Sequence, residues 1–265
     1  MTSTPFPIAL TIAGSDSGGG AGIQADLKTF HAFGVYGTSV ITAVTAQNTR
    51  GITSIHPIPL GHVMAQIDAV ATDLPPAALK TGMLATDELV STVADAIRRF
   101  DFAWYVMDPV MVATSGDRLV EEAAERSLLE ELLPLATVVT PNLEEAAILT
   151  GLVVETVDGM SAAAKRLVEL GASAALVTGG HLDGDAVDLL WNGFDQRLWS
   201  RPRIDTRHTH GTGCTLSAAI VAGLAQGQDL VQSVDRATRF IGRAIAAAPR
   251  LGQGRGPVNH FVVVD

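Results

Sequence analysis

Short apolar segments alternate with amphipathic segments along almost the whole chain. Residues 8–13 form a nearly continuous apolar run, which is typical of a strand buried on both faces. Residues 21–33 instead place Ile23, Leu27 and Phe30 at spacings of three and four, which predicts a helix with one buried face. The same patterns predict strands at 8–13, 35–46, 77–83, 103–107, 136–139, 174–177, 186–191 and 197–201, and helices at 21–33, 60–73, 86–100, 121–133, 140–149, 161–170, 213–225 and 230–248.

Strands that alternate with helices at this spacing predict an α/β fold, with a central, mostly parallel sheet flanked by helices on both faces. The strands at 186–191 and 197–201 are expected to form a hairpin around Asn192-Gly193. Residues 52–59 are expected to form a small strand or flap outside the main sheet. No linker, charge block or repeat divides the chain, so we expect a single domain spanning residues 1–265.

Polar and small residues follow most of the predicted strands. Ligands of parallel sheets bind beyond the carboxyl ends of the strands, close to helix N-termini. The segments that follow Ala13, Ala46, Lys80, Met107, Val139 and Val177 are therefore expected to face one pocket.

Composition narrows the class of protein. A hydrophobic share of 47% and a mean hydropathy of +0.29 exclude disorder as the main state. Thr215, Ser217 and Gly223 interrupt one of the longest apolar stretches, which argues against a membrane span, and no basic residue precedes the apolar N-terminal run as in a secretory signal. The net charge of −10 argues against a nucleic-acid partner. One cysteine excludes an intrachain disulfide and fits a cytoplasmic location.

The glycine-rich segment 210–215 stands directly before an apolar helix. Gly211, Thr212 and Gly213 allow successive backbone N–H groups to converge at a helix N-terminus, which suits a phosphoryl group. Cys214 then falls in the first helical turn, where we expect a lowered thiol pKa. The same residues also fit an ordinary glycine turn followed by a buried cysteine.

A second glycine-rich loop, 14–22, offers another ligand cradle. Residues 20–25 formally match the dinucleotide fingerprint, but the next strand ends at Ala46-Gln47 without the acidic residue that the fingerprint expects. The chain contains no Gly-Lys pair, which excludes a P-loop kinase.

Two carboxylates follow neighbouring strands of the predicted sheet. Asp108 ends one strand, and Glu145 lies in the first turn of the helix after the next strand. Such a pair suits Mg²⁺ bound to phosphates. Each residue also has a structural interpretation, since Asp-Pro is a common turn and Glu favours helix N-termini.

Other polar residues carry weaker signals. Gln47 and Asn48 at a strand end have the amide donors and acceptors to bind a heteroaromatic ring, or to satisfy loop backbone. His208 and His210 flank the glycine segment without the spacing of a zinc site, and are expected to be hydrogen-bonded loop residues.

The run from Ala9 to Asp26 strongly resembles the N-terminus of hydroxymethylpyrimidine/phosphomethylpyrimidine kinases, which belong to the ribokinase-like superfamily. Segments 42–49, 80–84, 108–119, 140–145 and 211–214 match in the same order, so the resemblance covers essentially the whole chain. Residues 108–117 are its most specific part.

The resemblance implies a three-layer α/β/α fold and a homodimer. It also implies that the chain uses ATP and Mg²⁺ to phosphorylate 4-amino-5-hydroxymethyl-2-methylpyrimidine, and then the monophosphate to the diphosphate, for thiamine biosynthesis.

The resemblance also assigns roles to individual positions. Cys214 resembles the general base of the family, which takes the proton of the substrate hydroxyl. Gly211, Thr212 and Gly213 resemble the family's anion hole. Gln47 resembles the residue that reads the aminopyrimidine edge. The remaining expected contacts are Gly14, Asp16, Ala21, Met83 and Val110 with the pyrimidine, Asn142, Thr178 and Gly180 with ATP, and Asp108 and Glu145 with Mg²⁺.

Three alternatives stay open at this point. A pyridoxal or pyridoxine kinase of the same superfamily shares the cysteine and the anion hole, although the Gln47 loop and residues 108–117 favour the pyrimidine. A non-catalytic pyrimidine-binding protein needs no Cys214, Asp108 or Glu145, and all three are present. An NAD-dependent oxidoreductase rests on residues 20–25 alone.

Overall fold

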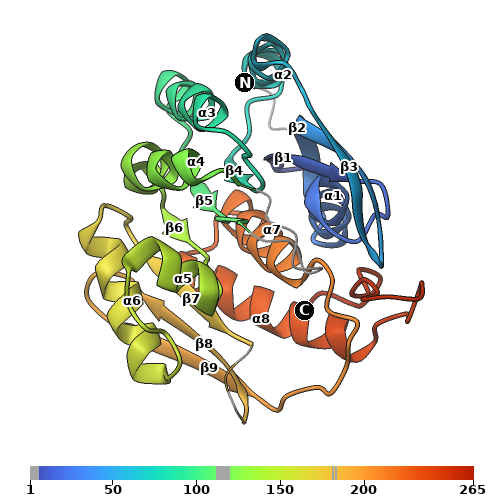
Figure 1. Ribbon diagram of the computed structural model, residues 1–265, viewed down its shortest axis with the longest axis vertical. Coiled ribbons are helices and arrows are strands. Elements are labelled where there is room, and N and C mark those ends of the chain that lie inside the picture. The colour runs from blue at the N-terminus through green and yellow to red at the C-terminus, as the bar shows by residue number, and fades with distance from the viewer. Residues whose placement is uncertain (1–5, 112–119, 181, 183) are drawn as a thin grey trace.

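The computed structural model describes residues 6–111, 120–180, 182 and 184–265, and these residues build one nine-stranded sheet with helices on both faces (Figure 1). Part of the family-specific segment 108–119 therefore lies outside the described residues. The strands are β1 (Ile8–Asp16), β2 (Tyr36–Asn48), β3 (Gly51–Pro57), β4 (Ala78–Thr81), β5 (Tyr105–Met107), β6 (Val138–Val139), β7 (Ala175–Gly179), β8 (Ala186–Trp191) and β9 (Gln196–Arg201). The helices are α1 (Gly22–Ala32), α2 (Leu60–Asp73), α3 (Asp87–Phe100), α4 (Glu122–Ser127), α5 (Leu143–Thr150), α6 (Val157–Glu169), α7 (Thr212–Ala225) and α8 (Leu230–Ala246), with a π-turn at Leu128–Leu132 and a 3₁₀ turn at Leu133–Leu135.

The sheet has the order β3-β2-β1-β4-β5-β6-β7-β8-β9. Six neighbouring strands pair in parallel, namely β2, β1, β4, β5, β6 and β7. The other pairs are antiparallel: β3 with β2, β8 with β7, and β9 with β8. This confirms the mostly parallel sheet and the hairpin at its far edge.

The expectation that residues 52–59 lie outside the main sheet is wrong. Strand β3 pairs antiparallel with β2 from Asn48↔Gly51 to Ala43↔Pro57 and forms one edge of the sheet. The physical reason is the tight turn at Thr49-Arg50, where the side-chain oxygen of Asn48 accepts a hydrogen bond from the Arg50 N–H at 2.8 Å. This turn folds the chain directly back onto β2.

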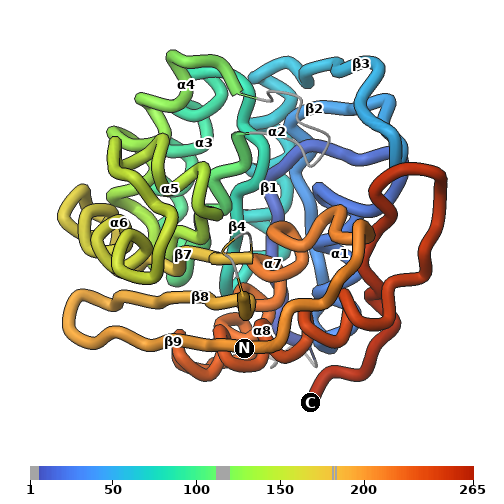
Figure 2. The backbone as a smooth tube through the Cα atoms, turned by 60° about the horizontal axis from the view of Figure 1, so that its bottom comes forward, coloured from blue at the N-terminus to red at the C-terminus, as the bar shows by residue number. Residues whose placement is uncertain are grey.

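Successive residues of the central strands enter two separate cores. Ala9, Ala78, Val106 and Val138 pack with residues of α1, α7 and α8. Their neighbours in sequence, Leu10, Leu79, Met107 and Val139, pack with residues of α2 to α6. Because side chains alternate across a strand, these apolar runs fill both faces and produce the three layers seen in Figure 2.

Helix α7 lies deep in this arrangement. Residues 215–224 are all buried, which explains why its sequence shows an apolar run without a polar face. No helix in the described part of the chain is long and apolar enough to cross a membrane.

A buried ion network lies at the carboxyl ends of the strands, on the face of the sheet that α1 and α7 cover. The ammonium of Lys80 on β4 has no exposed surface, and it lies 3.0 Å from Asp26 Oδ1 on α1 and 3.1 Å from Asp108 Oδ2 beyond β5. Hydroxyl groups complete it, since Thr11 donates to Asp26 at 2.6 Å and Ser217 on α7 donates to Asp108 at 2.9 Å. Five elements thus meet at one lysine.

The charges in this network are tightly coupled. Burial lowers the pKa of Lys80, but the two carboxylates outweigh that effect and raise its pKa above the ordinary value of lysine. Burial raises the pKa of Asp26, although Lys80 opposes the shift. The network therefore keeps Lys80 protonated, and removal of its charge would leave two buried carboxylates without a counter-ion.

We predict that Lys80→Met lowers the free energy of unfolding by roughly 3–5 kcal/mol, the usual cost of removing one partner from a buried ion pair. Urea unfolding followed by circular dichroism measures the change. Lys165→Met is the matched control, because Lys165 is exposed on α6 and its ammonium lies 5.3 Å from the centroid of the Trp191 ring. The control should lose less than about 1 kcal/mol. Equal stability of Lys80→Met and the wild type would contradict the prediction.

Candidate active site

The two glycine-rich segments that the sequence singled out lie against each other at the carboxyl edge of the sheet. Gly211, which precedes α7, has a φ of +80°. A Cβ atom at this position would collide with the carbonyl of Gly20. Only glycine therefore allows the segment 210–214 to approach the loop 14–22 this closely.

Asp16 locks the loop 14–22 in place. Its Oδ1 accepts from the N–H of Gly18 at 2.7 Å, and its Oδ2 accepts from Gly20 at 2.9 Å and Ala21 at 2.8 Å. The Nε2 atom of His210 lies 2.9 Å from the same Oδ2. Asp16 is buried, and although burial raises its pKa, the His210 and backbone hydrogen bonds outweigh that and lower it. Its carboxylate thus organises both segments, while direct contact with a substrate stays a prediction.

The start of α7 presents backbone donors. In the described part of the chain, the N–H groups of Gly211, Gly213 and Cys214 have no hydrogen-bond partner, whereas the N–H of Thr212 donates to Thr209 at 3.2 Å. Gly213 is exposed, and a Cβ atom there would meet open space. Free N–H groups at a helix N-terminus attract anions, so this geometry has the properties of the expected anion hole.

Cys214 does not have the lowered pKa that its place in the first helical turn suggests. Burial raises the pKa of its thiol to about 12, and the nearby carboxylates of Asp108 and Asp26 raise it further. The ammonium of Lys80 and a hydrogen bond from the N–H of Gly22 act in the opposite direction, without cancelling the effect of burial. The expectation was wrong because desolvation is the largest of the effects on this thiol.

Two of the expected pyrimidine contacts, Gly14 and Met83, touch each other, and a third, Gln47, lies at the end of the neighbouring strand β2. A Cβ atom at Gly14 would be 2.5 Å from the methyl group of Met83, so the end of β1 and the segment after β4 are in direct contact. Gln47 lies near the end of β2, where its N–H and C=O both bond to the Ser17 hydroxyl, at 2.8 and 2.7 Å. The Thr45 hydroxyl donates to the side-chain oxygen of Gln47 at 3.1 Å.

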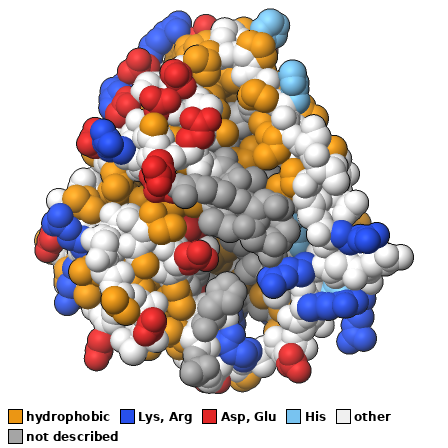
Figure 3. Space-filling model, viewed as in Figure 1, with side chains coloured by type: hydrophobic (Ala, Val, Ile, Leu, Met, Phe, Trp, Pro, Cys, Tyr) orange, Lys and Arg blue, Asp and Glu red, His pale blue; other side chains and the backbone are white. Residues whose placement is uncertain are grey.

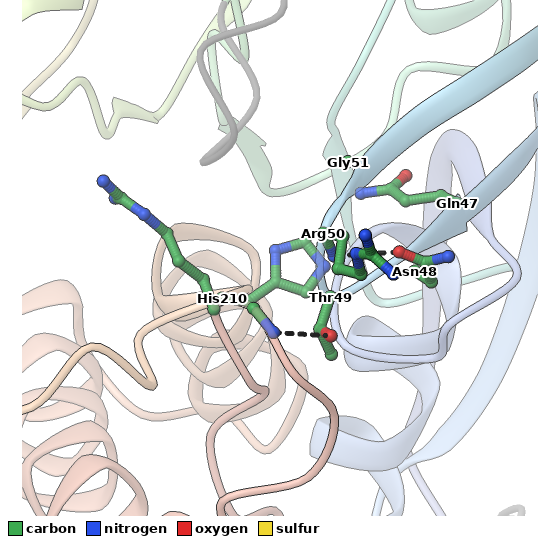
Figure 4. A pocket seen from close by; sticks show the side chains of 8 residues that line it. Gln47, Asn48, Thr49, Arg50, Gly51 and His210 are labelled. Atoms are coloured by element: carbon green, nitrogen blue, oxygen red, sulfur yellow. Dashed lines mark hydrogen bonds between the residues drawn. The ribbon is translucent and has the colours of Figure 1, made fainter.

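A cavity of about 270 Å³ opens beside Gln47, as Figure 4 shows. It lies between the β2–β3 turn and the segment that follows α8. Its lining residues are Gln47, Asn48, Thr49, Arg50, Gly51, His210, Gly254 and Arg255. His210 thus joins this cavity to the anion hole one residue further along the chain.

The expected metal residues are close enough to interact electrically. Burial and the charge of Asp108 raise the pKa of Glu145 to about 8. Glu145 also accepts from the N–H of Asn142 at 2.9 Å, and Asn142 accepts from the N–H of Glu145 at 3.0 Å, which caps helix α5. No group of three or more metal-ligating side chains occurs within the described ranges. Two carboxylates that repel each other remain a donor set that suits a hydrated Mg²⁺.

Two of the residues expected to face ATP, Asn142 and Thr178, lie beside each other, and Asn142 also bonds to Glu145. Asn142 and Thr178 pair through an isolated β-bridge, and the N–H of Thr178 donates to Pro141 at 2.9 Å. Gly180 is exposed, and a Cβ atom there would meet nothing. The Arg203 guanidinium donates to the carbonyls of Gly180, Leu182 and Gly184, and so holds this loop.

Sequence reasoning missed Lys80, Asp26 and the contact between His210 and Asp16. A lysine inside an otherwise apolar strand was the available signal, because a buried ammonium requires acidic partners. The expectation that His208 and His210 are hydrogen-bonded loop residues is confirmed, since His208 accepts from the N–H of Gly256 at 3.2 Å.

Comparison with known proteins adds independent information. The family model described as phosphomethylpyrimidine kinase matches residues 16–259. A hydroxymethylpyrimidine/phosphomethylpyrimidine kinase of Rhizobium meliloti is 56% identical, covering 96% of this chain and 97% of the relative. A bifunctional thiamine biosynthesis protein of Geobacter sulfurreducens is 49% identical over 98% of this chain, which spans 54% of that longer protein.

Solved structures agree with the fold. The ADP complex of Bacillus subtilis pyridoxal kinase superposes with a TM-score of 0.90 at 40% identity, covering 96% of this chain and 97% of the other. A phosphomethylpyrimidine kinase of Clostridium difficile gives a TM-score of 0.82 at 41% identity, covering 90% and 99%. The ribokinase-like α/β fold is thus confirmed, and the chain belongs to the phosphomethylpyrimidine kinase family.

Proposed function

We propose that this enzyme uses ATP to phosphorylate 4-amino-5-hydroxymethyl-2-methylpyrimidine and then its monophosphate, which yields the diphosphate for thiamine biosynthesis. The observation that carries the proposal is the set of unpaired N–H groups at Gly211, Gly213 and Cys214, beside the only thiol of the chain. Family membership and the names of the relatives support the same reaction.

Cys214 acts as the general base for the alcohol in this proposal. The thiolate accepts the proton of the substrate hydroxyl while the Gly211–Gly213 segment stabilises the phosphoryl group. With a pKa of about 12 the thiolate is the minor form, so its population depends on positive charge close to Sγ. Lys80 supplies such charge.

The walls of the acceptor site are Gly14, Ala21, Met83 and Val110, with Gln47 bonding to the aminopyrimidine edge. Asp16 holds the loop that carries Ala21, as its hydrogen bond to that residue indicates. Exclusion of water by these walls strengthens the electrostatic interactions within the site.

Asn142, Thr178 and Gly180 bind the nucleotide in this proposal, which the ADP complex of the related Bacillus subtilis enzyme supports. Asp108 and Glu145 hold Mg²⁺, partly through water. When bound, Mg²⁺ neutralises phosphate charge. The raised pKa of Glu145 fits this role, because a cation would relieve its repulsion by Asp108.

We also propose that the enzyme is a cytoplasmic homodimer. Val44 on β2 and Ile55 on β3 are exposed by 45% and 41%, and the pairs Val44↔His56 and Thr45↔Ile55 place them on opposite faces of this edge, so the homodimer is proposed from family membership. The single unpaired cysteine supports a reducing compartment.

A pyridoxal kinase activity is the second candidate, because the solved pyridoxal kinase of Bacillus subtilis superposes so well. We predict that kcat/KM is higher for the hydroxymethylpyrimidine than for pyridoxine, since Gln47 lies where it can bond to the amino group and ring nitrogen. A coupled ADP-release assay with the pyrimidine alcohol, its monophosphate and pyridoxine in parallel measures the ranking. The opposite ranking would reverse the assignment.

The Cys214→Ala variant should separate the two phosphorylation steps. The alcohol requires a base, so its turnover should fall at least about a hundredfold. The monophosphate, with a second pKa near 6, already offers an anionic oxygen at pH 8, so its turnover should fall less than about tenfold. Single-turnover kinetics with each acceptor measures both rates, and calorimetry should show unchanged binding of the alcohol. Unchanged turnover of the alcohol would eliminate Cys214 as the base.

A further inference from the structure

The cavity beside Gln47 has two fixed sides. The N–H of Arg255 donates to the carbonyl of Thr49 at 2.8 Å, and the N–H of Gly254 donates to the Thr49 hydroxyl at 3.2 Å. A Cβ atom at Gly254 would collide with the Thr49 carbonyl, so the C-terminal segment approaches the β2–β3 turn as closely as glycine permits. The backbone thus sets Arg50 and Arg255 at the same cavity.

Neither arginine side chain has a partner. In the described part of the chain, the guanidinium groups of Arg50 and Arg255 make no hydrogen bond and no ion pair, although both line the cavity. Exposed arginines without a printed partner also occur at Arg197, Arg207 and Arg250 in the described part of the chain, but only Arg50 and Arg255 share the described lining of this cavity. In a chain of net charge −10, two unpaired guanidinium groups at one cavity form a local site for an anion.

The charge distribution on the surface agrees with this. Figure 3 shows blue Lys and Arg side chains gathered on the side of the molecule where β3 and the C-terminal segment lie, while red acidic side chains gather over α3 and α4. No carboxylate is among the described residues that line the cavity, and the nearby Asp16 carboxylate lies behind the lining residue His210, 2.9 Å from its Nε2 atom. An anion bound by the two guanidinium groups therefore meets no carboxylate in the described lining.

Gln47 and His210 connect the cavity to the proposed reaction. The side-chain oxygen of Gln47 accepts from the Thr45 hydroxyl at 3.1 Å and keeps a second lone pair, and its amide N–H groups make no hydrogen bond within the described residues (Figure 4). His210 precedes Gly211 of the anion hole. Asn142 and Thr178, by contrast, do not line this cavity, so its position favours the acceptor over the nucleotide.

We propose that Arg50 and Arg255 form a binding site for the phosphoryl group of a phosphorylated acceptor, and so recognise the pyrimidine monophosphate but not the alcohol. This inference rests on the proposed function. A guanidinium fork matches phosphate oxygens in two parallel hydrogen bonds. The second phosphorylation brings two anionic phosphates together, and two arginines reduce their repulsion.

The test compares Arg50→Gln and Arg255→Gln with the wild type on both acceptors. For each variant, KM for the monophosphate should rise about tenfold, the scale of one charge-assisted hydrogen bond. KM for the alcohol should stay within about twofold. Arg197→Gln is the matched control, because Arg197 is exposed on β9 and far along the sheet from β3. The control should change neither value.

Salt and direct binding provide further readouts. Raising KCl from about 50 to about 300 mM should weaken binding of the monophosphate to the wild type. Binding to the two variants should change less, because salt screens only the charges that are present. Calorimetry with the monophosphate and no ATP should show weaker binding to both variants, whether or not turnover occurs. If the two variants changed KM and binding equally for the alcohol and the monophosphate, or changed neither, the proposed phosphoryl site would be refuted. A wild type that binds the monophosphate through these arginines yet phosphorylates neither acceptor would refute only the proposed function.

Discussion

The ammonium group of Lys80 lies between the carboxylates of Asp26 and Asp108 with no exposed surface, and the active-site edge of the sheet is arranged around it. Helix α1, strands β1 and β4, Asp108 directly after β5, and helix α7 each contribute a group to this network. A buried charge of this kind tolerates few arrangements, because each unpaired partner would cost several kcal/mol. The network therefore fixes where Asp108 and the start of α7 lie relative to each other.

Two further contacts extend this arrangement toward the substrate. The carboxylate of Asp16 binds both the N-terminal glycine loop and His210, and the N–H of Gly22 bonds to the thiol of Cys214. The acceptor loop and the anion hole are thus joined by buried hydrogen bonds. Such positioning matters for phosphoryl transfer, in which alignment and charge neutralisation supply most of the catalysis.

The strongly acidic composition and the handling of phosphates are compatible for a physical reason. On the face seen in Figure 3, acidic side chains gather over α3 and α4, whereas the anion hole uses backbone N–H groups that add no net charge. The arginines of the cavity lie on the β2–β3 turn and the C-terminal segment, and no carboxylate is among the described residues that line the cavity with them.

The alternation of apolar runs and amphipathic segments was enough to predict the sheet and most helices, because both faces of the parallel strands are buried. Local interactions moved the helix boundaries. The Thr156 hydroxyl oxygen accepts from the N–H of Gly159 and caps α6, so that helix begins at Val157 and not at residue 161. The predicted helix 121–133 changes to π and 3₁₀ turns near Pro134. The pairing of β3 with β2 depends on a turn that the pattern did not resolve.

The site was predictable where glycine or a family motif marked it, as at Gly14, Gly211 and Cys214. Contacts between residues far apart in sequence were not predictable, and Asp16 and His210, which are separated by 194 positions along the chain, show why. The thiol pKa of Cys214 was misjudged for a related reason, since its desolvation results from tertiary packing.

A crystal structure with a non-hydrolysable ATP analogue, Mg²⁺ and the pyrimidine alcohol tests the central claim most directly, namely that the fixed edge of the sheet brings acceptor, base and anion hole together. The account predicts the substrate hydroxyl within hydrogen-bond distance of Cys214 Sγ, and the γ-phosphate on the N–H groups of Gly211 and Gly213. A pyrimidine bound away from Cys214, or a γ-phosphate that does not touch these N–H groups, would contradict it.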